Sequence, residues 1–330
     1  MGAARFKVEE EDFLVEEDLG FCPSGEGEHC FLWVEKRGLG SNDAARAISE
    51  KLGVRKRLVS HCGLKDLRAV TRQWFSVHLP GQVSPAVEDV ESEGVRVLRV
   101  TRNLRKLRRG AHDGNRFCIR LRECGFAREL LELRWAEILR GGVPNYFGEQ
   151  RFGRRGQNVE RALALLRGEV EVRDRLIRGL YLSAARSWIF NTVVGARVED
   201  GSWGRVLDGE VFGFSNNRSL VLPEKVRGDE KERFAVGELE LTAPLWGEGE
   251  LLSVGEVRAL EERAVAGMGE LTAGLAAMGL RQERRVMRLI PRDGGIEWEG
   301  SDCVLRFALP KGAYATAVLR EVAGLDGAVD

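Results

Sequence analysis

The sequence predicts an α+β protein in which both ends of the chain build one domain and the middle builds another. Alternation of apolar and polar residues, typical of strands, dominates the chain from Phe6 to Leu121 and returns at Cys303–Leu309. Helical periodicity dominates from Arg128 to Met278, where glycine-rich, charged connectors join the segments. The 330 residues are enough for two hydrophobic cores. We therefore expect a discontinuous domain with the middle of the chain inserted into it.

The expected strands lie near the two ends of the chain. His29–Glu35 is apolar on both faces, as a strand covered on both sides would be. Asn115–Arg122 places Phe117, Ile119 and Leu121 on one face and arginines on the other. Further strands are expected at Phe6–Val8, Phe13–Val15, Phe75–Leu79, Val95–Val100 and Cys303–Leu309.

The expected helices begin with Asp43–Leu52. Ser41 and Asn42 are favourable residues for a helix start, and Gly53 is a favourable stop. Four later segments repeat apolar residues at helical spacing: Arg128–Arg140, Asn158–Arg167, Asp174–Val194 and Val254–Met278.

The composition is typical of a soluble globular protein, with 43% hydrophobic and 31% charged residues. No stretch approaches the length of a membrane span, and Met1–Phe6 lacks the apolar core of a signal peptide. The six cysteines form no C-x-x-C pair and match no zinc spacing. We therefore expect a cytoplasmic protein with free thiols, no membrane association and no metal.

The formal net charge is zero, but the charges are segregated along the sequence. Residues 101–122 carry eight basic side chains and one acid, and two more arginine clusters lie at 151–155 and 281–292. The acidic stretches 9–18 and 229–262 offset them. The planar fork of arginine suits phosphate. This pattern predicts that a polyanion binds one face of a molecule that is neutral overall.

The segment Gly63–Phe75 places one carboxylate, Asp66, between two apolar runs that resemble strands. An acid at such a junction is held by rigid elements and can face a cleft, as a catalytic group requires. A solvated Lys65–Asp66 pair in a turn is the more common explanation of this pattern. The residues by themselves leave both interpretations open. No phosphate loop, G-x-S-x-G or H-E-x-x-H motif offers a competing catalytic group.

Six segments, in order along nearly the whole chain, resemble the TruD family of tRNA pseudouridine synthases. Gly63–Gln73 resembles the signature that holds the catalytic aspartate of the family, which falls on Asp66. The other five segments are Lys7–Glu17, Gly25–His29, Val143–Gly153, Leu182–Ser187 with Phe190–Asn191, and Phe307–Thr316. The match is closest to the bacterial type, because the chain is short.

The resemblance implies a fold and an activity. The implied fold is a pseudouridine-synthase-like mixed, mainly antiparallel sheet with flanking helices, plus an inserted helix-rich TRUD domain. We expect residues 1–170 and 282–330 to form the catalytic domain, and 171–281 the inserted one. The implied activity is isomerisation of uridine to pseudouridine in tRNA, at position 13 in bacterial members, without a metal or organic cofactor. The expected partner is tRNA, with no protein partner, and the expected state is a monomer.

The resemblance also implies roles for individual residues. Asp66 is the catalytic nucleophile or base, and it can attack C1′, add to C6 of uracil, or take the proton from C2′. Each route needs an ionised carboxylate, so a nearby cation is expected, and Lys7 matches the N-terminal lysine of the family. The target base must leave its stack to reach a buried acid. The residues that match substrate-binding positions are Phe13, Asn145, Phe147 and Phe307.

Three alternatives stand beside these implied roles, and the last is the weakest. Core packing is the common role of a phenylalanine, and it competes with base binding at all three positions. A non-catalytic RNA-binding protein, such as a chaperone or assembly factor, would need only the basic cleft. A small-molecule hydrolase that uses Asp66 is the weakest alternative, because the sequence offers no second acid or histidine at a suitable spacing.

The expected contacts to RNA phosphates are Arg116, Arg120, Arg122, Arg151 and Arg154.

Overall fold

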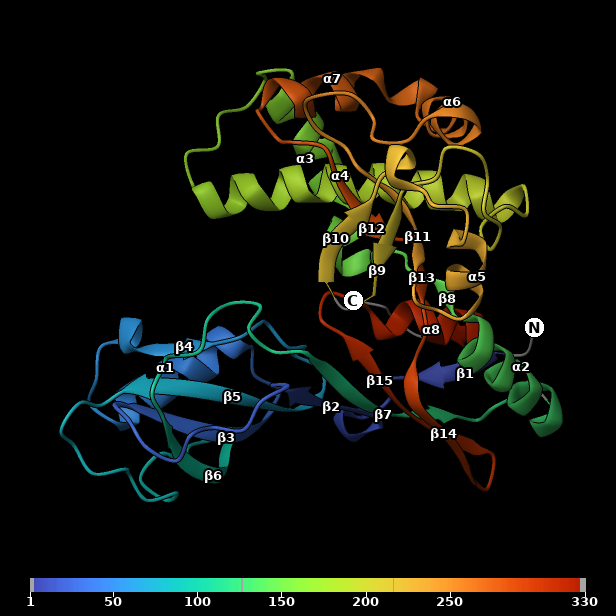
Figure 1. Ribbon diagram of the computed structural model, residues 1–330. Helices are drawn as coiled ribbons and strands as arrows, with labels where there is room; N and C mark the ends of the chain where they lie inside the picture. Colours follow the sequence, from blue (N-terminus) through green and yellow to red (C-terminus); the bar gives the residue numbers. More distant parts are fainter. Residues whose placement is uncertain (1–2, 126, 216, 327–330) are drawn as a thin grey trace. The chain divides into compact units, whose positions relative to one another are not determined.

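The computed structural model describes residues 3–125, 127–215 and 217–326, with side chains left out for Ala3, Arg154, Arg218 and 324–326 (Figure 1). Its internal contacts divide the chain into two compact units. The first contains the chain up to Arg140, Pro291–Ala315 and the segment from Leu319, and the second contains Gly141–Ile290 and Thr316–Val318. Residues 141–170 and 282–290 thus group with the second unit. The expected division into functional domains at 170 and 281 stays a prediction.

The first unit is built on one sheet, in which seven strands follow the order β14-β15-β7-β2-β5-β3-β6 (Figure 1). Three further strands join it, as β1 pairs with β7 and β16, and β4 pairs with β5. All pairs are antiparallel except β2 with β5 and β1 with β16. The strands are β1 (Ala3–Phe6), β2 (Phe13–Asp18), β3 (His29–Arg37), β4 (Val59–His61), β5 (Val70–His78), β6 (Val95–Asn103), β7 (Gly114–Arg122), β14 (Arg292–Glu299), β15 (Asp302–Pro310) and β16 (Gly324–Asp326). This mixed, mainly antiparallel sheet confirms the predicted fold class.

Burial along the strands follows the alternation seen in the sequence. In β7 the side chains of Phe117, Ile119 and Leu121 are buried, and Cys118 and the arginines that alternate with them lie on the other face. Helix α1 (Ser41–Lys51) buries Ala44 and Ile48 in a core cluster with residues of β3, β5 and β6. Helices α2 (Arg128–Gly141) and α8 (Ala315–Val322) and the short turns η1 (Glu10–Asp12) and η2 (Lys56–Leu58) complete the elements.

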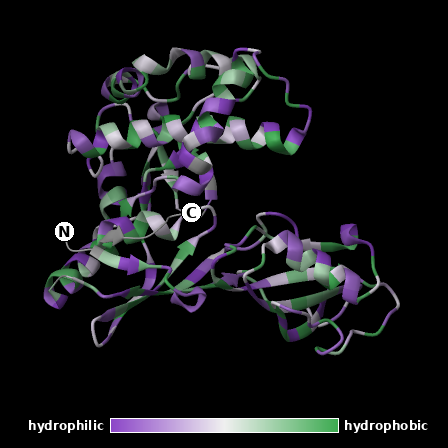
Figure 2. Cartoon of the chain, turned by 180° about the vertical axis from the view of Figure 1, so that it is seen from behind, coloured by the Kyte–Doolittle hydropathy of each residue, from purple (hydrophilic) through white to green (hydrophobic). Residues whose placement is uncertain are grey.

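The second unit combines helices with two small sheets. One sheet has the order β10-β9-β11-β12, and the other pairs β13 with β8. Helix α4 packs against α3 and β11 and shows bands of both hydropathies along its length (Figure 2). The helices are α3 (Gln157–Leu166), α4 (Arg175–Glu199), α5 (Glu230–Ala235), α6 (Gly255–Ala264) and α7 (Gly269–Ala277). The strands are β8 (Val143–Pro144), β9 (Phe212–Phe214), β10 (Asn217–Val221), β11 (Glu240–Leu245), β12 (Glu283–Val286) and β13 (Arg288–Leu289), and the short turns are η3 (Glu149–Phe152), η4 (Arg154–Gly156), η5 (Pro223–Lys225) and η6 (Ala266–Met268).

Two expected elements differ from the structure. The predicted strand Phe6–Val8 ends at Phe6, because Lys7 has a φ of 53°, in the left-handed region that strands exclude. The predicted helix Val254–Met278 is broken at Ala266–Met268, where Gly267 and Gly269 weaken helix propensity. The four-stranded sheet of the second unit was not predicted, since its strands are short and lie among the glycine-rich connectors. No helix in the described ranges has the length and apolar character needed to span a bilayer.

The charges of the second unit are largely paired inside it. Arg197 Nη2 lies 2.7 Å from Glu210 Oε1, with both side chains 1% exposed. Burial raises the pKa of Glu210, against the opposing effect of the Arg197 hydrogen bond. Arg284 pairs in the same way with Glu261 at 2.6 Å. A charge left alone in such a place would lack both water and partner.

Replacing Arg197 with methionine should therefore destabilise the protein by about 3–5 kcal/mol, because Glu210 would stay buried without its partner. Urea unfolding of the wild type and of Arg197→Met measures the loss. The double variant Arg197→Met/Glu210→Leu should recover most of it, since both charges are then removed. A single variant as stable as the wild type would contradict this account of the pair.

Candidate active site

Asp66 lies in the irregular segment that connects β4 to β5. These strands form an antiparallel pair, with Val59 opposite Val77. Strand β2 runs parallel to β5, and Leu14 pairs with Val70. Parallel neighbours begin at the same edge of a sheet, so the segments that precede β2 and β5 lie side by side there. This pairing brings the segment of Lys7 to the segment of Asp66.

Lys7 is close enough to Asp66 for their charges to interact. Burial lowers the pKa of Lys7, and the charge of Asp66 raises it, with a smaller lowering by Arg68. The ammonium group also lies 4.1 Å from the ring centroid of Phe13, within cation–π range. The left-handed backbone at Lys7 is a strained conformation for a lysine. The strain indicates that neighbouring structure determines where this side chain lies.

A second lysine, Lys36, contacts the Asp66 segment directly, and no pattern in the sequence pointed to this contact. It lies near the end of β3, where it pairs with Thr71, and its side chain is fully buried. Its Nζ donates hydrogen bonds to the carbonyl oxygens of Leu39 at 2.6 Å and Asp66 at 3.0 Å. Burial lowers the pKa of Lys36 to about 8, although the charge of Asp66 opposes the shift. Because a lysine near a strand end is usually exposed, the position of Lys36 in the sequence does not indicate that it is buried.

Further hydrogen bonds fix the rest of the segment. The backbone N–H of Lys65 donates to Ser41 Oγ at 2.9 Å, and Ser41 Oγ donates to Gln73 Oε1 at 2.6 Å. Gln73 Nε2 donates to the carbonyl of Gly63 at 3.3 Å. The Lys65 ammonium donates to Glu17 Oε1 at 2.9 Å, so this charge is held by an acid other than Asp66. The carboxylate of Asp66 therefore belongs to a segment tied to α1, β2, β3 and β5.

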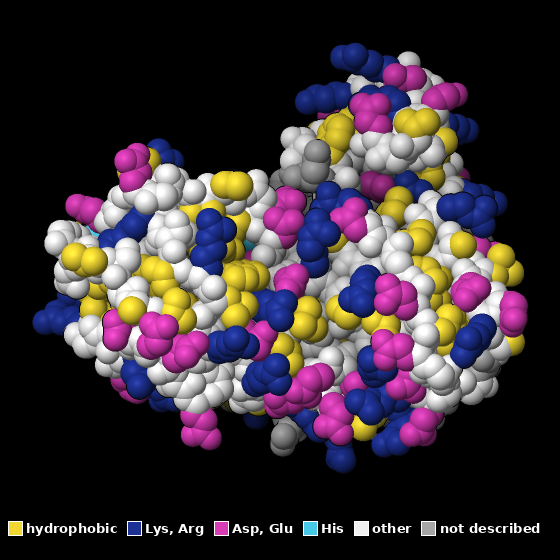
Figure 3. Space-filling model, turned by 90° about the horizontal axis from the view of Figure 1, so that it is seen from below, with side chains coloured by type: hydrophobic (Ala, Val, Ile, Leu, Met, Phe, Trp, Pro, Cys, Tyr) yellow, Lys and Arg dark blue, Asp and Glu magenta, His cyan; other side chains and the backbone are white. Residues whose placement is uncertain are grey.

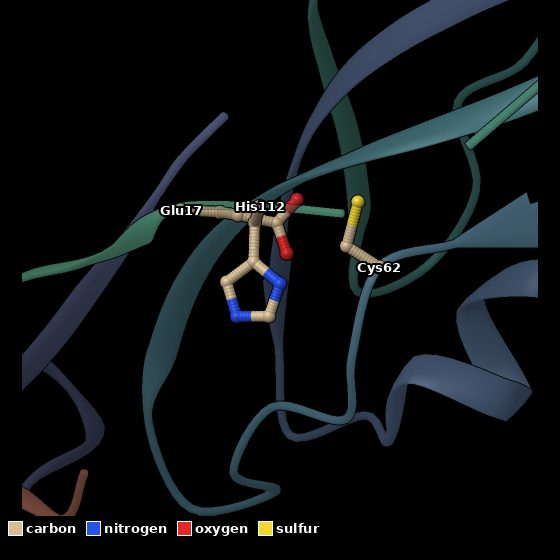
Figure 4. A group of neighbouring side chains, drawn as sticks. All are labelled: Glu17, Cys62 and His112. Atoms are coloured by element: carbon tan, nitrogen blue, oxygen red, sulfur yellow. The ribbon is translucent and has the colours of Figure 1, made fainter. Parts of the chain in front are cut away.

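Glu17, Cys62 and His112 point toward one another beneath this segment, with possible ligand atoms within 4.8 Å (Figure 4). The donor chemistry does not fit a metal ion well. Both carboxylate oxygens of Glu17 already accept hydrogen bonds, from Lys65 Nζ and from the N–H of Trp74. Burial, with help from the charge of Glu17, raises the pKa of the Cys62 thiol to about 12, whereas a metal binds the thiolate. The group is better explained as a buried Lys65–Glu17 ion pair with neutral neighbours.

Two of the predicted substrate-binding rings lie in a buried aromatic cluster of the first unit. Phe13 and Phe307 are each 2% exposed. Phe117 lies between them, with ring centroids 6.0 Å from Phe13 and 5.3 Å from Phe307, and Trp135 lies 5.7 Å from Phe307. These contacts are those of core residues. A role in base binding would require these rings to become exposed, and it stays a prediction.

The other two predicted substrate-binding residues lie in the second unit and share one arginine. Arg285 Nη2 donates to Asn145 Oδ1 at 2.7 Å, and its guanidinium lies 4.3 Å from the Phe147 ring centroid. Asn145 Nδ2 donates to the carbonyl of Val286 at 3.0 Å. Phe147 also packs edge-on against Phe190, with ring centroids 5.4 Å apart. Asn145 and Phe147 thus form one site with Arg285, which the sequence had placed only in a basic cluster.

The arginines predicted to contact phosphate are mostly paired with acids. Arg116, Arg120 and Arg122 form ion pairs at 2.7–2.8 Å. On the face shown in Figure 3, basic and acidic side chains lie intermixed instead of segregated. Arg151 donates to Ser183 Oγ at 3.2 Å, and the side chain of Arg154 lies outside the described residues. The acids that pair with the three β7 arginines are Asp293, Glu299 and Asp12. Their role as phosphate contacts stays a prediction.

The fold is shared with a crystal structure of a candidate tRNA pseudouridine synthase D from Methanosarcina mazei, with a TM-score of 0.72. The two sequences are 23% identical, and the structural match covers 98% of this chain and 94% of the Methanosarcina mazei chain. The likeness defines a mixed-sheet fold of the kind that the resemblance implied.

The sequence comparisons identify the family. The family model for tRNA pseudouridine synthase D (TruD) matches residues 2–173 and 171–322. The tRNA pseudouridine synthase D of Methylococcus capsulatus is 44% identical over 98% of this chain and 91% of its own length. The tRNA pseudouridine synthase D of Stutzerimonas stutzeri is 43% identical over 100% of this chain and 95% of its own length. The chain belongs to the TruD family.

Adding equimolar Zn²⁺ to protein treated with a chelator should leave its melting temperature unchanged, because Lys65 already occupies the Glu17 carboxylate. Differential scanning calorimetry measures this directly. Cys62→Ser serves as the matched variant. A rise in melting temperature for the wild type that Cys62→Ser lacks would contradict the ion-pair interpretation.

The stability of the wild type relative to Lys36→Met should depend on pH. The pKa of Lys36 is about 8 in the folded protein and 10.5 in the reference state, so the unfolded chain binds this proton more strongly between those values. The relative stability should therefore rise with pH from about 8 to about 10.5 and stay level below about 8. Urea unfolding of both proteins across this range measures the difference. A difference that does not change with pH would mean that Lys36 titrates normally.

Proposed function

We propose that Asp66 is the catalytic carboxylate of this tRNA pseudouridine synthase. The activity follows from family membership across nearly the whole chain and from relatives of that name. One observation carries the assignment of Asp66: Lys36 donates a hydrogen bond to the segment that holds it. The charge of Asp66 also raises the pKa of both Lys7 and Lys36, against the effect of burial. A solvated turn pair would not explain a fully buried lysine that donates to the Asp66 carbonyl.

The reaction is an isomerisation, so it consumes no oxidant or reductant. The C1′–N1 bond of uridine breaks, the uracil turns, a C1′–C5 bond forms, and the proton from C5 is released while N1 gains one. Asp66 acts first at C1′, at C6 or on the C2′ proton, and all three routes begin with a carboxylate. The ammonium groups of Lys7 and Lys36 supply positive charge beside it. Lys7 is thereby the second catalytic residue that we propose.

The substrate-binding roles of Phe13, Asn145, Phe147 and Phe307 remain part of the proposal, supported by the family segments in which they lie. The target uracil must leave its stack before Asp66 can reach it. Asn145 already accepts a hydrogen bond from Arg285, so it presents an ordered amide to a ligand. To hydrogen-bond the uracil edge, the Asn145 amide would exchange its hydrogen bond with Val286 or with Arg285 for one to the base.

Three finer points also belong to the proposal. The target is position 13 of tRNA, as the resemblance to bacterial members implies. The enzyme acts as a monomer, since no segment of the sequence suggests an oligomer seam. It works in the cytoplasm, where unmodified tRNA is available to a bacterial enzyme.

Asp66→Asn should reduce the rate of pseudouridine formation by about 10³-fold or more, because the amide can neither attack nor accept a proton. The assay measures release of tritium from uridine labelled at C5 in an unmodified tRNA transcript. Asp43→Asn is the matched control, since Asp43 is an exposed acid of α1 in the same unit, paired with Arg46. It should retain the wild-type rate.

The outcomes separate the candidate functions. Equal rates for Asp66→Asn and the wild type would remove Asp66 from catalysis. Tight tRNA binding without conversion by either protein would favour a non-catalytic RNA-binding protein. Mapping the product in the transcript tests position 13.

A further inference from the structure

The first unit contains a basic pocket that none of the preceding roles explains. It has a volume of about 580 Å³ and lies between the end of β4 and the loop after β6. This volume is within the range of small-ligand sites. Its polar lining carries three cations and no carboxylate. The lining residues are Asn42, Val59, Ser60, His61, Lys106, Leu107, Arg108 and Arg109.

The cations of this pocket differ from those of β7 in having no acid beside them. Lys106, Arg108 and Arg109 are exposed, and no ion pair or hydrogen bond joins the side chain of any of them to another described residue. Arg122 of β7, in contrast, pairs with the buried Asp12 at 2.8 Å. An unpaired arginine can take a phosphate without first giving up a carboxylate. The basic stretch of the sequence therefore divides into a paired strand and an unpaired loop.

The buried side chain of Leu107 anchors the loop. Leu107 packs in a core cluster with Phe31, Cys62 and Trp74, and its N–H donates to Ser76 Oγ at 3.0 Å. This anchor leaves the residues on both sides, Lys106 and Arg108, exposed. Exposed side chains on an anchored backbone lose less freedom on binding than those of a loose tail would.

Hydrogen bonds connect the pocket region to the start of the segment that carries Asp66. The N–H of Gly110 donates to the carbonyl of Cys62 at 2.8 Å, and His61 Nδ1 donates to the carbonyl of Gly63 at 2.8 Å. Burial lowers the pKa of His61, the hydrogen bond to Gly63 and the charge of Glu17 raise it, and the charges of Arg109 and Lys65 lower it. A polyanion bound here would be held a few residues from the proposed catalytic carboxylate.

We propose that this pocket binds a phosphodiester of the tRNA backbone and so positions the substrate strand at the Asp66 segment. The proposal rests on the proposed function, because it takes tRNA as the ligand. The shared chemistry is phosphate, and a free phosphate ion is the other possible source. The RNA backbone is favoured because several unpaired cations line one open pocket beside the catalytic segment, which suits a polymer of phosphates.

The test compares two double variants that remove the same charge from the same unit. Arg108→Gln/Arg109→Gln removes two cations of the pocket. Arg96→Gln/Arg99→Gln removes two exposed arginines of β6 whose side chains likewise have no ion pair or hydrogen bond to a described residue and do not line the pocket. Both pairs lie on the surface, so both variants should fold, which circular dichroism and melting temperature verify. The probe is an unmodified tRNA transcript, whose dissociation constant is measured across a range of salt concentrations.

The pocket variant should bind the transcript about 10-fold more weakly at physiological salt, and the slope of log K against log salt should fall by about 1–2. The β6 variant should stay within about 2-fold of the wild type. In single-turnover reactions at saturating enzyme, the pocket variant should lose less in conversion rate than in affinity, because Asp66 is untouched and saturation restores binding. Equal losses of tRNA affinity in both variants would show that only the overall charge of the protein matters, and would overturn the proposal.

Two further results distinguish the pocket from the other proposals. Wild-type conversion with unchanged binding by the pocket variant would overturn the pocket and leave the enzyme standing. Loss of binding by the pocket variant, with no conversion by the wild type, would support the pocket and remove the proposed chemistry. Stabilisation by inorganic phosphate that the pocket variant lacks, with unchanged tRNA affinity, would assign the site to a free ion and overturn the RNA assignment.

Discussion

The site depends on one parallel strand pair inside a mainly antiparallel sheet. Because β2 and β5 run in the same direction, the segments that lead into them meet at one edge. The first brings Lys7 and the second brings Asp66. Strand β3 is antiparallel to β5, so its last residues return to that same edge and deliver Lys36. Reversal of either strand would place these groups at opposite ends of the sheet.

Burying charge at this edge requires that each charge has a partner. Lys65 and Glu17 satisfy one another, and Arg72 lies between Glu16 and Glu35 of the neighbouring strands. Lys36 has two carbonyl oxygens and the nearby charge of Asp66. Such pairs add little stability beyond an apolar core, but breaking one is costly. The network therefore fixes the Asp66 segment more than it strengthens the fold.

The sequence predicted the strands of the first unit well because alternation along β7 and β15 directly reflects burial on one face. It predicted Asp66 and Lys7 through ordered motifs. It could not predict Lys36, because a lysine acquires a buried role only from the residues that the fold packs over it. It also could not show that Arg120 and Arg122 are paired, since their acids lie up to 182 positions away or across the sheet. Local charge density shows where cations are, whereas tertiary structure decides which of them remain unpaired.

This distinction separates two uses of arginine in one basic stretch. On β7 each guanidinium group forms an ion pair with an acid from a distant part of the sequence. These arginines are therefore already bound within the folded structure. In the loop that contains Arg108 and Arg109, an inserted leucine holds the backbone and the cations remain available. The proposed affinity of the pocket for a polyanion rests on the second group, because a paired arginine must lose one partner to gain another. A chain with equal numbers of acids and bases can thus bind tRNA at a place where the fold leaves the bases without acids.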